Sequence, residues 1–188
     1  MPFVRKYEEK DYKDVQYVCL HCEDGPEDPP TLQEFVLHTF CDYYIDHEPH
    51  NCFVLDDDNG KAVGYVICAE DYDTYKKIFD EEYLELTRPQ GEGLYNWAKT
   101  STVLQAKYKD EYPAHLHIDL TPPYHRKGFG GQLIKALCHH LAQKGVKGVM
   151  LTVGDKNVNG INFYKKCGFT LLEHADTDVA FGIKTAEV

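Results

Sequence analysis

The chain has 188 residues, 43% of them hydrophobic and 27% charged, which is the composition of one globular domain and not of a disordered or fibrous chain. Its net charge of −11 argues against nucleic acid or an anionic membrane as the main partner, because both attract basic surfaces. No apolar run approaches the roughly 20 residues that cross a bilayer, and the charged N-terminal segment is untypical of a signal peptide, so we expect a cytoplasmic protein.

The N-terminal quarter predicts one strand and two helices. Residues 3–7 are expected to form a strand and residues 11–22 a helix, followed by an acidic loop with three prolines over residues 23–30. Thr31 and Glu34 have the spacing of a capping box at the start of the second helix. Both helices should lie over one face of a sheet.

The chain contains seven cysteines, an odd number. Cys19 and Cys22 have the spacing of a zinc or redox pair, but no second pair matches it and the helical pattern continues through it. We therefore expect free thiols in a reducing compartment.

The next segment predicts a β-hairpin. Strands are expected over residues 51–55 and 62–69, and the Asn59-Gly60 pair between them is a strong turn signal. The acidic run 56–58 lacks the spacing and the terminal Glu of a calcium-binding loop, so we interpret it as a solvated turn.

A long segment of about 71–107 separates this hairpin from the next strand. Residues 72–86 and 94–107 have helical character, and residues 89–93 interrupt it. The segment is longer than a plain connection needs, so we expect a helical insertion that either shapes a substrate pocket or packs as an extra helical layer.

The C-terminal half alternates strands and helices. The expected elements are a strand at 114–120, a helix at 129–144, a strand at 149–153, a helix at 157–166, and closing strands at 169–172 and 179–184. This pattern predicts a single α/β domain over residues 1–188, with a mixed sheet and helices on both of its faces.

The most informative stretch runs from Leu120 to Gly131, where a strand end leads through a loop to glycines that open a helix. Backbone N–H groups at such a helix start are free to bind an anion, and the helix dipole favours negative charge there. Arg126 and Lys127 add two cations, so a diphosphate is the expected ligand. The glycine spacing is neither that of a P-loop nor that of a dinucleotide-binding fingerprint.

This stretch resembles the central signature of the GCN5-related N-acetyltransferase (GNAT) family, [Q/R]-x-x-G-x-[G/A], in the register of His125 to Gly130. Leu120-x-Pro122 matches the apolar-x-Pro that usually leads into it. His125 stands where the family usually has Gln or Arg, at a position that helps to hold the pyrophosphate largely through its backbone. The resemblance implies a mostly antiparallel sheet of about six to seven strands and acetyl-CoA as cosubstrate, with no metal.

A second match lies downstream, where residues 157–169 resemble the family's N-x-x-A-x-x-x-Y-x-x-x-G-F. Gly160 stands where the family usually has Ala. The resemblance implies that Asn157 contacts the pantetheine arm and that Tyr164 approaches the thioester sulfur and protonates the departing thiolate.

Residues 51–65 and 115–120 are also similar to the acetyltransferase-like domain at the C-terminus of O-GlcNAcase and to its free-standing bacterial relatives. Some members of that group have lost the glycine loop, whereas this chain keeps it. Nothing in the sequence resembles the glycosidase domain, so no sugar hydrolysis is implied.

The resemblance implies an N-acetyltransferase in which a primary amine, on a small molecule or a peptide, attacks acetyl-CoA directly in a ternary complex. It also implies a possible homodimer through the C-terminal strands. The expected cofactor-binding residues are Ile118, Leu120, His125, Arg126, Lys127, Gly128, Phe129, Gly130, Gly131, Asn157 and Tyr164. The alternative is a catalytically inactive module that binds acyl-CoA or a protein partner.

Asp119 is the first choice for the general base, with His117, Glu70 and Asp71 as the other candidates. Strand alternation places His115, His117 and Asp119 on one side of their strand. A bulge is usual in this strand of the fold and can exchange the two sides, so the sequence leaves the side open. His115-x-His117 lacks an evident third ligand for zinc.

Overall fold

A computed structural model describes all 188 residues, and its centre is a seven-stranded sheet in the order β1-β2-β3-β4-β5-β7-β6. Every neighbouring pair of strands is antiparallel except β4 and β5, which are parallel. The strands are β1 (Phe3–Lys6), β2 (Phe53–Asp56), β3 (Ala62–Ala69), β4 (Ala114–Leu120), β5 (Gly148–Gly154), β6 (Thr170–Ala175) and β7 (Asp178–Lys184). The predicted mixed, mostly antiparallel sheet is confirmed.

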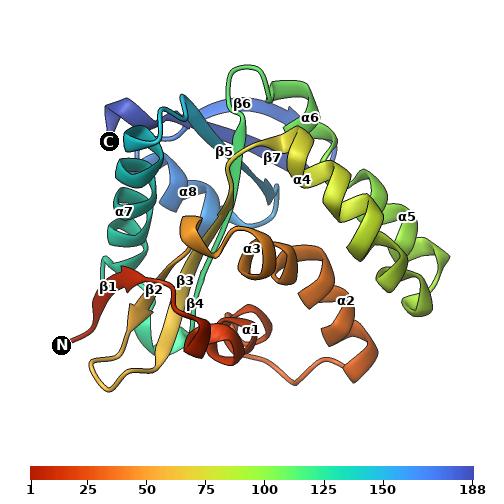
Figure 1. Cartoon of the computed structure of the whole chain (residues 1–188), viewed down its shortest axis with the longest axis horizontal. Helices are drawn as coiled ribbons and strands as arrows, with labels where there is room; N and C mark the ends of the chain where they lie inside the picture. Colours follow the sequence, from red (N-terminus) through yellow and green to blue (C-terminus); the bar gives the residue numbers. More distant parts are fainter.

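Helices cover both faces of this sheet, with α7 on one side and α1 to α5 on the other (Figure 1). The α-helices are α1 (Tyr12–Leu20), α2 (Pro30–Phe40), α3 (Asp42–His47), α4 (Tyr72–Ile78), α5 (Glu92–Thr100), α6 (Val103–Tyr108), α7 (Phe129–Gln143) and α8 (Val158–Lys166). None of them combines the length and the hydrophobicity that a membrane crossing requires.

Strand β3 shows how the sheet separates two cores. Its side chains alternate, so that Tyr65 and Ile67 join the core under α1 to α5, and Val66 and Cys68 join the core under α7. All eight residues of β3 are buried, because both faces of the sheet are covered.

The second predicted helix differs from the structure at both ends. It begins at Pro30 after Pro29 and has no side-chain cap, so the predicted Thr31 capping box is wrong; proline at the first position already fixes a helical φ. At Cys41 the backbone breaks, and α3 follows. Residues 41–45 are all buried, and one regular helix cannot turn five consecutive residues toward a single core.

The segment between β3 and β4 is helical, as predicted. After α4, residues 79–83 form a π-helical turn and residues 84–90 a 3-10 helix. Tyr83 and Leu84 are adjacent in sequence and both are buried, at the point where the helix changes its winding. These residues and α5 pack on the core under α1 to α5.

The acidic hairpin turn is held by its own carboxylates. Asp56 accepts the backbone N–H groups of Asp58 and Gly60, and Asp57 accepts those of Asn59 and Lys61. Their acceptor capacity is used by the turn and, for Asp56, by an ion pair with Arg5, which agrees with a structural role.

Candidate active site

The parallel pair β4 and β5 separates soon after it begins. Only Ala114 with Val149 and His115 with Met150 are paired, and from Leu116 onward β4 has no partner on that side. Beside the diverging strands lies a cleft of about 1040 Å³, a size typical of small-molecule sites. Its lining includes the end of β4, the loop before α7, the first turns of α7, one side of α8 and the segment that follows α1.

The loop before α7 builds one end of the cleft from glycines. Gly128 has φ +86°, a left-handed conformation that favours glycine, and it places the chain at the start of α7. Gly130 lies against the ring of Phe163, since a Cβ there would come within 2.9 Å of it. Gly131 faces open space in the cleft. The exposed N–H groups of the first turn of α7 can therefore approach an anion closely.

Four basic side chains also line the cleft: His125, Arg126, Lys135 and Lys166. Arg126 has φ +59°, unusual for a residue with a side chain, in the middle of this loop. Together with the glycines they fit a diphosphate group such as that of coenzyme A, because they supply positive charge and N–H donors without bulk.

The His125 ring nitrogen lies 2.7 Å from the Leu120 carbonyl oxygen and donates to it, so this side chain braces the loop against the end of β4. Two of the predicted cofactor residues lie outside the cleft lining. Phe129 packs near Tyr124, and the ammonium of Lys127 lies over the Tyr124 ring.

The backbone of β4 presents donors to the cleft. Thr121 donates its N–H to Val63 of β3, and the N–H directions of a strand alternate, so the amides of Ile118 and Leu120 point away from β3. On that side β5 has already diverged. These are the two amides predicted to pair with the pantetheine arm.

The start of α8 forms a further wall. Asn157 caps this helix, because its side-chain oxygen accepts the N–H of Gly160 at 2.8 Å. Gly160 replaces the usual Ala, and a Cβ there would lie only 3.0 Å from the Asn157 side chain. Asn157 and Tyr164 both line the cleft. Burial, together with the charge of Asp119, raises the pKa of the Tyr164 phenol, so it remains a protonated donor.

Asp119 lies in the cleft and is half-buried. The register of β3 and β4 is continuous from Gly64 opposite Leu120 to Ala69 opposite His115, so no bulge exchanges the sides of β4. Asp119 therefore faces the α1 layer, and the Tyr65 hydroxyl donates to its carboxylate at 2.6 Å. Burial raises the pKa of Asp119 to about 6, although the hydrogen bond from Tyr65 lowers it.

The acidic segment after α1 also lines the cleft, through Cys22, Glu23 and Asp24. The carboxylates of Glu23 and Asp24 thus join that of Asp119 in the lining. No residue of the segment 71–107 lines the cleft. Of the two roles considered for that segment, packing as a helical layer agrees with this arrangement.

The other candidate bases are placed elsewhere. Asp71 caps α4 by accepting the N–H of Thr74. His115 is buried under Tyr44, whose hydroxyl lies 2.9 Å from its Nε2. His117 packs edge-on against Tyr44 and Phe40, and burial lowers the pKa of its ring to about 4.

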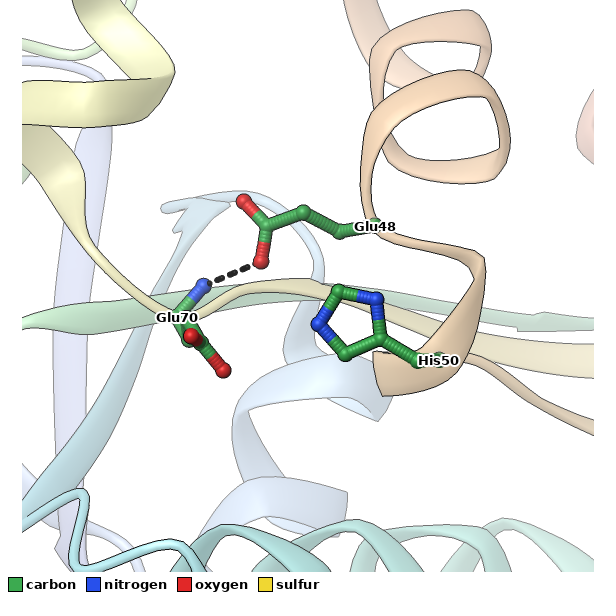
Figure 2. Close-up of side chains that lie close together, drawn as sticks. All are labelled: Glu48, His50 and Glu70. Atoms are coloured by element: carbon green, nitrogen blue, oxygen red, sulfur yellow. Dashed lines mark hydrogen bonds between the residues drawn. The ribbon is translucent and has the colours of Figure 1, made fainter.

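Glu70 belongs to a separate polar network at the other end of β3. One possible metal-ligand atom from each of Glu48, His50 and Glu70 lies within 4.8 Å of the others, which is a spacing compatible with metal ligation. Figure 2 shows that the Glu70 N–H, not its carboxylate, is directed at Glu48. The Glu70 carboxylate pairs with Lys144, and Glu48 also accepts Tyr43 and Asn51. We therefore assign this cluster a structural role.

Sequence reasoning identified the glycine loop, Asp119 and the α8 residues, but it missed Tyr65, Glu23, Asp24, Lys135 and Lys166. For Lys135 a signal exists, because it lies one helical turn after Gly131 and shares its face. For Tyr65 the signal is the strand register, which a single sequence does not provide.

Comparisons with known proteins agree with this geometry. The model of the Acetyltransferase (GNAT) family matches residues 15–169. The L-ornithine N5-acetyltransferase NATA1 of Arabidopsis thaliana is 45% identical over 51 residues, which are 27% of this chain and 22% of that protein. The chain thus spans less than a quarter of the length of this curated relative.

Solved structures match over nearly the whole chain. The crystal structure of SsHAT has a TM-score of 0.86 at 26% identity, and the match covers 98% of both chains. A polyamine N-acetyltransferase of Drosophila melanogaster that forms N-acetylagmatine has a TM-score of 0.65 at 16% identity, over 98% of this chain and 100% of that one. The PaiA N-acetyltransferase of Thermoplasma acidophilum, solved with coenzyme A, has a TM-score of 0.61 at 15% identity, over 98% and 99%. The last two show the shared fold alone.

Proposed function

The chain belongs to the acetyltransferase (GNAT) family, and on that premise we propose that it transfers the acetyl group of acetyl-CoA to a primary amine by direct attack in a ternary complex. The predicted family is thereby confirmed. The observation that carries the proposal is one cleft whose lining combines basic and acidic side chains with Asp119 and Tyr164.

The basic side chains of the cleft suit the cosubstrate. Arg126, Lys135 and Lys166 and the first turn of α7 would hold the diphosphate, and the amides of Ile118 and Leu120 would hold the pantetheine arm and polarise the reacting carbonyl. Acetyl-CoA supplies the acetyl group as an activated thioester. Holding both reactants side by side in one cleft makes the attack effectively unimolecular.

Asp119 and Tyr164 would handle the protons. An amine attacks only as the free base, so Asp119 would remove a proton from the ammonium group, directly or through water. Tyr164 would donate its hydroxyl proton to the departing thiolate.

The acidic side chains of the cleft suit an amine that is a cation before it reacts. Glu23 and Asp24 lie in the same cleft as Asp119 and would raise the local concentration of such an acceptor. The polyamine acetyltransferase and the ornithine acetyltransferase described above act on small cationic amines, which supports this acceptor class for the chain. We propose a small-molecule amine; a peptide amine is the alternative.

Calorimetric titration with acetyl-CoA tests the cofactor site. The wild type should bind in the micromolar range, and Gly131→Glu should lose binding. The substitution places a carboxylate, without a clash, in the first turn of α7, where the diphosphate would bind. Gly93→Glu is the matched control, since its Cβ also meets open space but it lies outside the cleft.

Thiol release with agmatine, spermidine, ornithine and a basic peptide then tests turnover. Acetylation of at least one small amine is expected. Binding of acetyl-CoA without turnover of any acceptor would favour the non-catalytic module, and absence of binding by the wild type would refute the proposed cofactor site.

A further inference from the structure

We propose that Tyr65 is a positioning residue for the Asp119 base, and that its hydroxyl clamps the carboxylate in the ionised form. This inference rests on the proposed function, because it concerns the group that would accept the proton of the amine. Tyr65 ends the segment 51–65 whose resemblance is described above, but that resemblance assigns it no role.

Tyr65 is fixed on β3 directly opposite Asp119 in the register. Its side chain is fully buried in the core under α1 to α5, and its hydroxyl reaches Asp119 at 2.6 Å. A buried phenol so placed has little freedom to turn away. It therefore restricts the orientation of the Asp119 carboxylate in the cleft.

Cys22, from the segment that follows α1, lines the cleft together with Asp119. Its thiol is directed at the Cys19 carbonyl oxygen, 3.9 Å away, so the Tyr65 hydroxyl is the side-chain donor that holds the Asp119 carboxylate.

The clamp opposes the effect of burial. Asp119 has no ion-pair partner, and burial alone favours its neutral, non-basic form. Among the groups facing it, the Glu23 charge raises the pKa of Asp119, His125 lowers it, and Tyr164 lies across the cleft as a neutral phenol. The Tyr65 hydroxyl stabilises the ionised form, which leaves a base that is ionised near neutral pH yet can still take up a proton.

The pH dependence of kcat/KM tests this clamp. Tyr65→Phe keeps the buried ring and removes the donor, so the acidic limb of the profile should move up by about one to two pH units. Activity should fall several-fold at pH 7 and recover to near the wild-type level at pH 9. A uniform loss at every pH would instead indicate a merely structural role and would overturn the inference for Tyr65.

A further variant sharpens the test. Tyr44→Phe is the control: it removes another buried hydroxyl, which bonds to His115 and not to Asp119, and it should leave the limb in place.

A titration without turnover separates this inference from the proposed function. In protein labelled with 13C at the aspartate carboxyls, the Asp119 resonance is the one missing in Asp119→Asn. Its midpoint should lie near pH 6 in the wild type and higher in Tyr65→Phe. An unmoved midpoint would refute the clamp even in an active enzyme, whereas a moved midpoint in a protein that acetylates no amine would leave the clamp standing and refute the function.

Discussion

Tyr164 shows how a single side chain serves both packing and the cleft. Its ring packs against Phe169 and Phe181 in the core under α7, while the residue also lines the cleft. An acid for a departing thiolate needs a proton that it keeps until the step occurs, and the raised pKa of this phenol meets that need.

Tyr164→Phe removes the proton donor and keeps the ring. We expect kcat for the best amine to fall by about 10²-fold, within the range found for general acids, with little change in acetyl-CoA affinity. Thiol release under saturating substrates measures the first quantity and calorimetry the second. An unchanged kcat would remove Tyr164 from its assigned role.

At the scale of residues, the sequence was sufficient where chemistry is encoded locally. Gly128 and Asn157 are positions of the two sequence motifs, and Gly131 directly follows the first motif, so spacing along the chain identified all three. Tyr65 and Glu23 were missed because the fold brings them to Asp119 from distant segments. Long-range register is a property of the folded sheet, and no local pattern records it.

At the scale of elements, β4 places similar polar residues in different surroundings. His115 and Asp119 lie on the same side of the strand, but His115 is covered by Tyr44 and Tyr75, while Asp119 opens to the cleft. Burial lowers the pKa of His115 to about 3, with His117 adding to the effect. The ring is thus neutral in the folded protein.

This burial makes stability depend on pH. The folded pKa of His115 lies below the unfolded value of about 6.5, so the unfolded chain takes up a proton first as the pH falls. The stability contribution is complete above pH 6.5 and is lost progressively toward pH 3. Between pH 7 and pH 5 we expect His115 alone to cost about 2 kcal/mol of unfolding free energy.

Urea unfolding of His115→Gln at the two pH values checks this expectation. Whatever the stability of the variant at pH 7, its loss between pH 7 and pH 5 should be smaller than that of the wild type by about 2 kcal/mol. His139→Gln, on the exposed side of α7, should lose as much as the wild type. Equal losses in all three proteins would contradict the assignment.

Element boundaries were predictable where one pattern acted alone. Residues 62–69 and 114–120 form strands with the predicted bounds, because their β-pattern has clear turn signals around it. The break at Cys41 and the π-helical turn after α4 were not predicted. In both places the need to bury adjacent residues overrides the regular helical period, and that need exists only in the tertiary structure.

At the scale of the whole molecule, the side chains that line the cleft include basic residues although the chain as a whole is acidic. The chain carries a net charge of −11, yet one cleft is lined by both basic and acidic side chains. Composition alone did not show where a polyanion could bind. The fold resolves this by drawing its basic residues from three places: the loop before α7, α7 itself and α8.

The short pairing of β4 with β5 also has a mechanical consequence. The strands β1 to β4 form one half of the sheet, or plate, and β5 to β7 form the other. Only two residue pairs of β4 and β5 join the two plates, so we expect the plates to move relative to each other more easily than the strands within each plate. Acetyl-CoA lying between the plates would act as a removable brace. Hydrogen exchange should then slow on binding at the Ile118 and Leu120 amides, while those of His117 and Asp119, which face β3, stay slow throughout. Ligand-independent protection at all four amides would mean that the two plates are already rigidly joined.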